Sequence, residues 1–300
     1  GYFGEVAQAA HARERLQGRS LTGAKYPELE ADPILVHPDV RRMLLACRAF
    51  TEGARALTAW TTLGIIDAEH HPDPERRQAG DDLASLLTPV VKAFQTDLGF
   101  ETTNTALQVC GGYGFTRDYG MEQFVRDCRI TQIYEGTNGI QGLDLVGRKM
   151  PANFGRSLRR FFHPVSEFIA AEAGNERMKE FVEPLAKAFE RLQRATGWLA
   201  EQSLKSRDEA GAAATDYLHL FGWVAFAYLW ARMAKVLADA ARRQRSSGPN
   251  AAAAGAGGEN SRMARPARSQ AVPAEAQVPD SVDLRRPSRH ACLPGRAPAR

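Results

Sequence analysis

Residues 108–141 read QVCGGYGFTRDYGMEQFVRDCRITQIYEGTNGIQ, and this stretch carries most of what the sequence says about fold and site. It begins with a glycine-rich turn, GGYG at residues 111–114, continues as an amphipathic run and ends near the carboxylate Glu135. Glycines let a backbone approach a large ligand closely, and a carboxylate can act as a general base. The stretch therefore predicts an opened backbone and a potential base within one segment.

Two interpretations of the glycines Gly111, Gly112 and Gly114 stand side by side. One is a helix C-terminus followed by a tight turn, where glycine tolerates a positive φ. The other is close approach of the backbone to a phosphate-bearing ligand near a helix terminus. The dinucleotide-binding fingerprint is excluded, because no strand precedes the glycines and their spacing differs.

Glu135 is the candidate base, although a lone glutamate is usually a solvated surface residue. Its neighbours Ile130, Ile133, Tyr134 and Ile140 indicate a mostly buried setting. Burial would strengthen the carboxylate as a proton acceptor near neutral pH.

Arg15 lies at the end of the first predicted helix, in ARERLQGR. A solvated basic face is one interpretation. The other is a guanidinium clamp on a pyrophosphate, where bidentate geometry favours arginine over lysine.

Composition narrows the class of protein. The chain has 300 residues, of which 44% are apolar and 25% charged, with a net charge of +4, so nothing points to nucleic acid. The four cysteines are widely spaced without a CxxC pair, which argues against a metal site and favours a reduced, cytoplasmic setting. No apolar run reaches the ~20 residues that span a bilayer, so we expect no membrane span.

Hydrophobic periodicity predicts an all-α fold in two bundle-like layers. Up to Pro151 we expect a loop at 70–77, and helices at 5–17, 40–69, 81–99 with a kink at Pro89, 102–109, 121–133 and 138–150. Beyond Pro151 we expect a turn at 174–176, and helices at 153–173, broken near Pro164, 177–206 and 212–243.

Residues 246–300 differ in composition. They contain no Phe, Tyr, Trp or Ile and are dominated by Ala, Pro, Gly, Ser and Arg, which predicts a disordered tail. Its abrupt start suggests a frame change, and a natural linker or arginine-rich tail is the alternative. Because the chain begins at Gly1 without a Met, we expect a fragment.

With these motifs in place, residues 108–141 resemble the C-terminal helical domain of acyl-CoA dehydrogenases. ARERLQGR and HPDVRRMLLACRAFTEGARAL fit the same domain in the same order, so the resemblance covers residues 6–150. Residues 153–243 look like the appended module of larger bacterial members, a subgroup that includes the 3-methylmercaptopropionyl-CoA dehydrogenases. The resemblance implies a four-helix up-down bundle over 1–150, a second helical module over 151–245 and the tail over 246–300.

The resemblance also implies site residues. Glu135 would be the catalytic base that removes the α-proton of an acyl-CoA thioester while FAD takes the β-hydride, and Tyr134 and Gly136 would shape the thioester pocket. The residues implied to bind FAD, partly across a subunit interface, are Arg15, Gln17, Gln108, Gly111, Gly112, Thr137 and Asn138.

The implied partners are an acyl-CoA substrate, an electron-transfer flavoprotein and further copies of the chain in a homodimer or tetramer. An oxidase that uses oxygen is a close alternative. The family's N-terminal helical domain and middle β-domain have no counterpart in this sequence. An inactive truncated product or a helical scaffold module is therefore the alternative function.

Overall fold

The computed structural model describes residues 2–246, and this part of the chain is all-α, as predicted. No β-strand occurs among these residues, where Leu16 and Pro33 form an isolated antiparallel bridge. The predicted tail from residue 247 onward lies outside the described residues.

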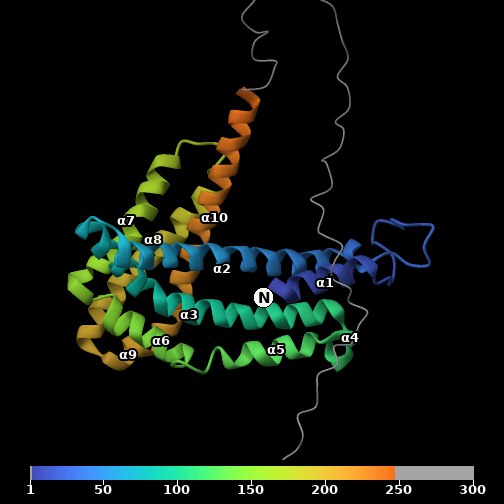
Figure 1. Ribbon diagram of the computed structural model, residues 1–300, viewed down its shortest axis with the longest axis horizontal. Coiled ribbons are helices and arrows are strands. Elements are labelled where there is room, and N and C mark those ends of the chain that lie inside the picture. Colours follow the sequence, from blue (N-terminus) through green and yellow to red (C-terminus); the bar gives the residue numbers. More distant parts are fainter. Residues whose placement is uncertain (1, 247–300) are drawn as a thin grey trace, which may run out of the picture. The chain divides into compact units, whose positions relative to one another are not determined.

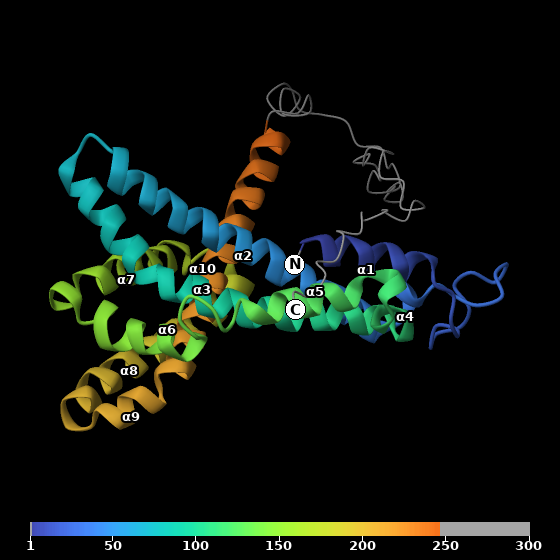
Figure 2. The same cartoon turned by 60° about the horizontal axis from the view of Figure 1, so that its bottom comes forward.

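Two long antiparallel helices form the frame, α2 (Pro38–His70) and α3 (Pro74–Cys110), and they lie side by side in Figures 1 and 2. Each begins with proline in its first turn, where the missing N–H costs no hydrogen bond. The Asp73 carboxylate also accepts a hydrogen bond of 2.9 Å from the Glu75 N–H and so caps α3.

The prediction of a loop at 70–77 and of separate helices at 81–99 and 102–109 is wrong, because α3 is continuous from Pro74 through Pro89 to Cys110. Packing along α2 stabilises the whole helix against its local helix breakers. The two helices approach closely at Gly80, where an added Cβ would lie 2.4 Å from the Gly64 carbonyl oxygen.

The other helices surround this pair. The pair is preceded in sequence by α1 (Tyr2–Glu14) and the 3₁₀ turn η1 (Ile34–Val36). It is followed by α4 (Gly112–Phe115), the 3₁₀ turn η2 (Arg117–Tyr119), α5 (Met121–Ile130), α6 (Asn138–Asp144) and the π-helical turn η3 (Leu145–Lys149). Beyond it come α7 (Ala152–Glu172), α8 (Lys179–Lys205), α9 (Arg207–Ala212) and α10 (Ala214–Ser246).

Two predictions beyond Pro151 need correction. Helix α7 continues through Pro164, and its irregularity lies at residues 153–155, where φ is between 52° and 71°. The short helix α9 was not predicted. Ser206 begins it by accepting a hydrogen bond of 3.3 Å from the Glu209 N–H.

One apolar core joins α2, α3, α7, α8 and α10. Phe161 and Phe221 are fully buried with ring centroids 4.3 Å apart, and Phe94 meets Phe226 at 4.9 Å. Helix α10 crosses α2 and α3 at a steep angle in Figures 1 and 2. The core therefore ties residues beyond Pro151 directly to the α2–α3 pair.

By length and composition α10 could also cross a membrane, although we expected no helix of that kind. Core helices meet the same criteria, and the face of α10 that carries Phe221, Val224 and Ala225 is fully buried in this core. Burial within the fold accounts for this face of α10, while Trp223, Val236 and Leu237 are more than half exposed.

Candidate functional site

A hollow of about 550 Å³ lies where α1 ends, and we call it the Arg15 hollow. Four of the predicted cofactor residues line it together, Arg15, Gln17, Gly111 and Gly112. Gln108 precedes them on the last turn of α3; its side chain is exposed and does not line the hollow. Arg15 and Gly112, 97 positions apart in sequence, thus line the same hollow.

The aromatic wall of the hollow was not predicted. The Arg15 guanidinium carbon lies 4.9 Å from the centroid of the Tyr113 ring, a cation–π contact. His11 meets the same ring edge-on at 6.4 Å. Burial and the charge of Arg15 lower the pKa of His11, so Arg15 is the cation of this wall at neutral pH.

Asp32 holds the segment that carries Arg15 and Gln17. Its carboxylate accepts hydrogen bonds of 2.8–3.0 Å from the backbone N–H groups of Ser20, Lys25 and Tyr26. Its own backbone pairs with that of Gln17, whose N–H donates to the Asp32 carbonyl at 2.9 Å. Burial alone would raise the pKa of Asp32, but these hydrogen bonds and nearby Arg19 lower it to about 2.

Gly111 ends α3 with φ 60° and ψ −142°, a backbone conformation that L side chains rarely adopt. A Cβ added at Gly111 or Gly112 would meet nothing within 4 Å. The interpretation as a helix end with a positive φ is therefore confirmed at Gly111, and the approach of this backbone to a phosphate-bearing ligand stays a prediction.

Glu135 occupies a different place, the loop of residues 131–137 between α5 and α6, which we call the Glu135 loop. Its φ is 55°, in the left-handed region, and Gly136 follows at 80°. Such a conformation costs a residue other than glycine about 1–2 kcal/mol, and strained residues of this kind cluster at functional sites.

The prediction that Glu135 is mostly buried is wrong for this chain. Glu135, Gly136 and Thr137 are exposed, and the four apolar neighbours that suggested burial are each about half exposed: Ile130 51%, Ile133 47%, Tyr134 48% and Ile140 54%. About half of each of these side chains is therefore open to solvent. Nothing within residues 2–246 covers this apolar surface.

Side chains of α3 hold the Glu135 loop in place. The Lys92 ammonium donates to the Gly136 carbonyl at 2.7 Å and to Asn138 Oδ1 at 2.8 Å. Asn138 Nδ2 donates to Asp97 Oδ1 at 2.6 Å, and Gln132 Nε2 donates to the same oxygen at 2.7 Å. Gln141 closes the loop from α6 by donating to the Glu135 carbonyl at 3.0 Å.

Asp97 is the centre of this network. Burial raises the pKa of Asp97, but the hydrogen bonds from His219, Gln132 and Asn138 outweigh burial and leave that pKa below its usual range. Burial lowers the pKa of Lys92, while attraction to Asp97 and Glu135 opposes the shift. The Glu135 loop is therefore bound through charge-assisted hydrogen bonds, which are the stronger kind.

The structure places the predicted residues in two sites at opposite ends of α5. This helix has 10 residues and so spans about 15 Å. Arg15, Gln17, Gly111 and Gly112 lie at its start, and Tyr134 to Asn138 lie beyond its end. They do not form a single pocket within one chain.

Sequence reasoning missed the residues that hold the loop: Lys92, Thr96, Asp97, Gln132 and His219. Lys92 and Thr96 are one turn apart on α3, which places two polar groups on the same side of an otherwise apolar stretch. His219 interrupts the apolar sequence of α10. These polar positions in apolar helices were the available signal.

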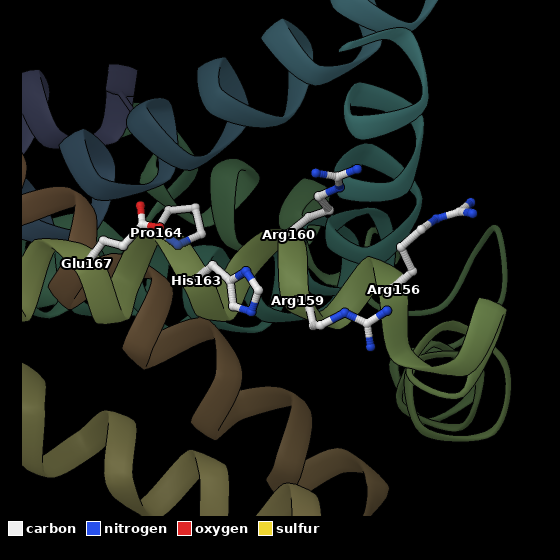
Figure 3. A pocket seen from close by; sticks show the side chains of 6 residues that line it. All are labelled: Arg156, Arg159, Arg160, His163, Pro164 and Glu167. Atoms are coloured by element: carbon white, nitrogen blue, oxygen red, sulfur yellow. The ribbon is translucent and has the colours of Figure 1, made fainter. Parts of the chain in front are cut away.

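A further hollow, of about 380 Å³, lies along α7, and Figure 3 shows the side chains that line it: Arg156, Arg159, Arg160, His163, Pro164 and Glu167. The arginines do not converge on one point, since Arg159 and Arg160 project to different sides of the helix. Arg156 instead forms a bidentate pair with the buried Asp82 at 2.7 and 2.9 Å. Arg159 donates to the Phe154 carbonyl at 2.9 Å. These cations are used within the fold.

No group of three or more His, Cys, Asp or Glu residues within residues 2–246 could hold a metal ion. The expected absence of a metal site concerns the whole protein and stays a prediction.

Comparison with known proteins identifies the family. The family described as "Acyl-CoA dehydrogenase, C-terminal domain" matches residues 4–150, and the one described as "Acetyl-CoA dehydrogenase C-terminal like" matches residues 161–258. The chain belongs to the acyl-CoA dehydrogenase family. The divisions at residues 150 and 245 stay predictions, and one apolar core runs across the first of them.

Curated members of the acyl-CoA dehydrogenase family are similar over much of the chain. The 3-methylmercaptopropionyl-CoA dehydrogenase of Ruegeria pomeroyi is 46% identical over 165 residues, which are 55% of this chain and 27% of that protein. The broad-specificity linear acyl-CoA dehydrogenase FadE5 of Mycobacterium tuberculosis is 33% identical over 236 residues, 75% of this chain and 38% of that protein. The chain thus spans well under half the length of these relatives.

Solved structures agree on the fold. ACDH-11 of Caenorhabditis elegans, in complex with C11-CoA, matches with a TM-score of 0.61 at 16% identity over 76% of this chain and 37% of its own. An acyl-CoA dehydrogenase of Bacillus anthracis, complexed with FAD, matches with a TM-score of 0.56 at 21% identity over 83% and 40%. The prediction of the family's C-terminal helical fold is confirmed.

Proposed function

We propose that this chain supplies the C-terminal helical part of an FAD-dependent acyl-CoA dehydrogenase, with Glu135 as the base that removes the α-proton of an acyl-CoA thioester. The observation that carries the proposal is the conformation of Glu135. A residue that favours negative φ is held at φ 55° in an exposed loop by three hydrogen-bonded side chains of neighbouring helices. Strain that persists only because its surroundings impose it indicates a functional constraint.

The chain's own residues perform the proton transfer. A carboxylate oxygen of Glu135 takes the proton from the α-carbon, and the electrons of that C–H bond form the double bond as the β-hydride leaves. When bound, FAD supplies the two-electron acceptor for that hydride. Lys92 and Gln141 fix the two consecutive carbonyls that follow the Cα of Glu135, those of Gly136 and Glu135 respectively. The carboxylate can therefore be aimed without reorganising the backbone.

The Arg15 hollow suits the phosphate-bearing part of FAD. A guanidinium, an aromatic ring and open glycine backbone face about 550 Å³ of space, and this donor set matches a pyrophosphate with an attached ring system. Arg15, Gln17, Gly111 and Gly112 would hold that part. As the resemblance implies, the hollow and the base would serve flavins of two different subunits, in a homodimer or tetramer.

The half-exposed Ile133, Tyr134 and Ile140 around Glu135 fit the same proposal. An acyl thioester pocket needs apolar walls, and these residues, with Tyr134 and Gly136 nearest the base, would supply one wall. The other wall would come from parts of the longer relatives that this chain does not contain. We further propose an electron-transfer flavoprotein as electron acceptor and a cytoplasmic location, as the resemblance implies.

The test is flavin reduction in the protein expressed from its full genomic reading frame. Adding an acyl-CoA should bleach the flavin absorbance, and Glu135→Gln should slow bleaching about a thousandfold. Glu122→Gln, on the first turn of α5, is the matched control and should bleach like the wild type. Undiminished bleaching in Glu135→Gln would remove Glu135 as the base, and peroxide formation would identify an oxidase.

A helical interaction module without catalysis is the second candidate. Two observations favour it. The apolar face around the Glu135 loop is exposed, and the chain spans only 27–38% of the length of these relatives. The coding sequence upstream of Gly1 and through Ser246, translated in all frames, separates the two candidates. Absence of the family's other domains there would favour the interaction module.

A further inference from the structure

Asp97 receives hydrogen bonds from three different elements. Its Oδ1 accepts from Gln132 and Asn138, and its Oδ2 accepts from His219 Nε2 of α10 at 2.8 Å. Because a carboxylate can only accept, the proton of this contact is on Nε2. His219 and Asp97 are 122 residues apart in sequence, so tertiary packing alone brings them together.

The two amides on Oδ1 hold both ends of the Glu135 loop. Gln132 belongs to the beginning of the loop, and Asn138 is the first residue of α6. The Asn138 N–H also donates to the Gln132 carbonyl at 3.2 Å, which closes the loop into a ring around Glu135. One carboxylate thus binds side chains at both ends of the loop.

The surroundings of His219 fix its ring firmly. The flanking residues Leu218 and Phe221 are buried in the core, and the ring meets Phe94 edge-on at 5.7 Å. The His219 side chain is 29% exposed and that of Asp97 is 21% exposed, so water competes only partly for their hydrogen bond.

We propose that His219 is a positioning residue for the Glu135 loop, because it orients Asp97 and through it the two amide side chains that close the loop. The helix α10, which lies within the separately matched residues 161–258, thereby controls the geometry of the candidate base. The inference rests on the proposed function only for the role of Glu135; the mechanical coupling stands without it.

Charge makes this coupling depend on pH. The hydrogen bond to Asp97 raises the pKa of His219 above its ordinary 6.5, although burial opposes this shift. The negative charges of Glu101 on α3 and Asp216 on α10 also raise the pKa of His219. On the other face of Asp97 lies the Lys92 ammonium. The protonated ring binds Asp97 more strongly, so the stabilisation is complete below pH 6.5 and is lost as pH rises through the higher folded pKa.

The experiment is hydrogen–deuterium exchange of the 300-residue chain, followed by mass spectrometry of peptides covering residues 129–141. His219→Phe keeps an aromatic ring but donates no hydrogen bond. It should speed exchange in these peptides about tenfold at about pH 6, the effect of one charge-assisted hydrogen bond. His219→Gln can still donate to Asp97, so it should restore most of the protection.

The pH profile separates positioning from simple packing. After correction for intrinsic exchange, protection of the wild-type loop should fall as the pH rises above 6.5 and passes through the raised pKa of His219. In His219→Gln it should stay constant over that range, since glutamine does not titrate. A purely structural role of His219 would give wild type and His219→Gln the same profile.

Tyr217→Phe is the matched control, because it removes another hydrogen bond of α10, the 2.8 Å contact between Tyr217 and Thr196 of α8, without touching the network. It should leave residues 129–141 protected as in the wild type. Equal protection in His219→Phe and wild type, or equal loss in His219→Phe and Tyr217→Phe, would overturn the proposal. Since no substrate or flavin is used, failure of the proposed function would leave this result unchanged.

Discussion

Two carboxylates organise the two halves of the candidate site, and they do so in different ways. Asp32 is fully buried and accepts hydrogen bonds from the backbone N–H groups of residues 6–12 positions away in its own segment. Asp97 is partly exposed and accepts hydrogen bonds from side chains on three elements up to 122 positions away.

The difference shows what each half depends on. One wall of the Arg15 hollow is stabilised by contacts within its own segment. The loop there hydrogen-bonds to Asp32 of the same segment, so its conformation depends little on how the other helices pack. The Glu135 loop is held by α3, α6 and α10 together, so its geometry depends on how those helices pack. The hollow should therefore respond to local changes, and the Glu135 loop to changes far along the chain.

Removing the Asp32 carboxylate should give the largest effect. Asp32→Ala leaves the N–H groups of Ser20, Lys25 and Tyr26 without their acceptor, so one substitution removes three hydrogen bonds from this segment. We expect exchange of the amides in residues 18–33 to rise about a hundredfold. Hydrogen–deuterium exchange of that segment measures it.

The comparison also predicts where the Asp32 effect stops. Residues 129–141 should exchange at the wild-type rate in Asp32→Ala, since no contact of Asp32 reaches them. Glu30→Ala, two residues away and exposed, should leave both segments unchanged. Faster exchange in both segments of Asp32→Ala would mean that the two halves are not independent.

Removing the Asp97 carboxylate should speed amide exchange less in any one segment than Asp32→Ala does, but it should do so in more segments of the chain. Asp97→Ala deprives Gln132, Asn138 and His219 of an acceptor that water can partly replace. We expect the free energy of unfolding to fall by about 2 kcal/mol in denaturant titrations. Exchange should rise in residues 129–141 and in the part of α10 around His219.

The control for Asp97 lies one turn further along the same helix. Glu101 is exposed, so Glu101→Ala should change the free energy of unfolding by less than about 0.5 kcal/mol. A similar loss in both variants would show that negative charge on α3, and not the network, stabilises the fold.

Much of the fold could be predicted because helical periodicity is a local property. The helix expected at 40–69 is found at Pro38–His70, and those expected at 177–206 and 212–243 are found at Lys179–Lys205 and Ala214–Ser246. The breaks predicted within α3 and at Pro164 were wrong, because packing along neighbouring helices outweighs one proline or glycine. Propensity does not contain that tertiary contribution.

The site was predictable only in part, for a related reason. Arg15 and Gly111 were named as cofactor residues only through the resemblance, and the structure brings them to one hollow, while their cofactor role stays a prediction. The exposure of Glu135 was not foreseen, since apolar neighbours in sequence do not say which way they face. The pairing of Asp97 with His219 bridges 122 residues, and nothing in either local sequence announces it.

The smallest predicted effect tests the strain at Glu135. At φ 55° glycine avoids the steric conflict that a side chain creates, so Glu135→Gly should raise the free energy of unfolding by about 1 kcal/mol. Glu135→Gln keeps the side chain and its conflict, so its free energy of unfolding should equal that of the wild type. Denaturant titrations of the three proteins measure both changes.

Replacing an exposed residue of a regular helix by glycine gives the matched comparison for Glu135→Gly. Arg126 is exposed on the regular helix α5, where glycine is unfavourable, so Arg126→Gly should lower the free energy of unfolding by about 0.5–1 kcal/mol. Opposite signs at positions 126 and 135 would establish that the fold holds Glu135 in a conformation that its own side chain disfavours. A loss of stability in both variants would mean that the loop is relaxed, and the conformation of Glu135 would then give no support to its role as the base.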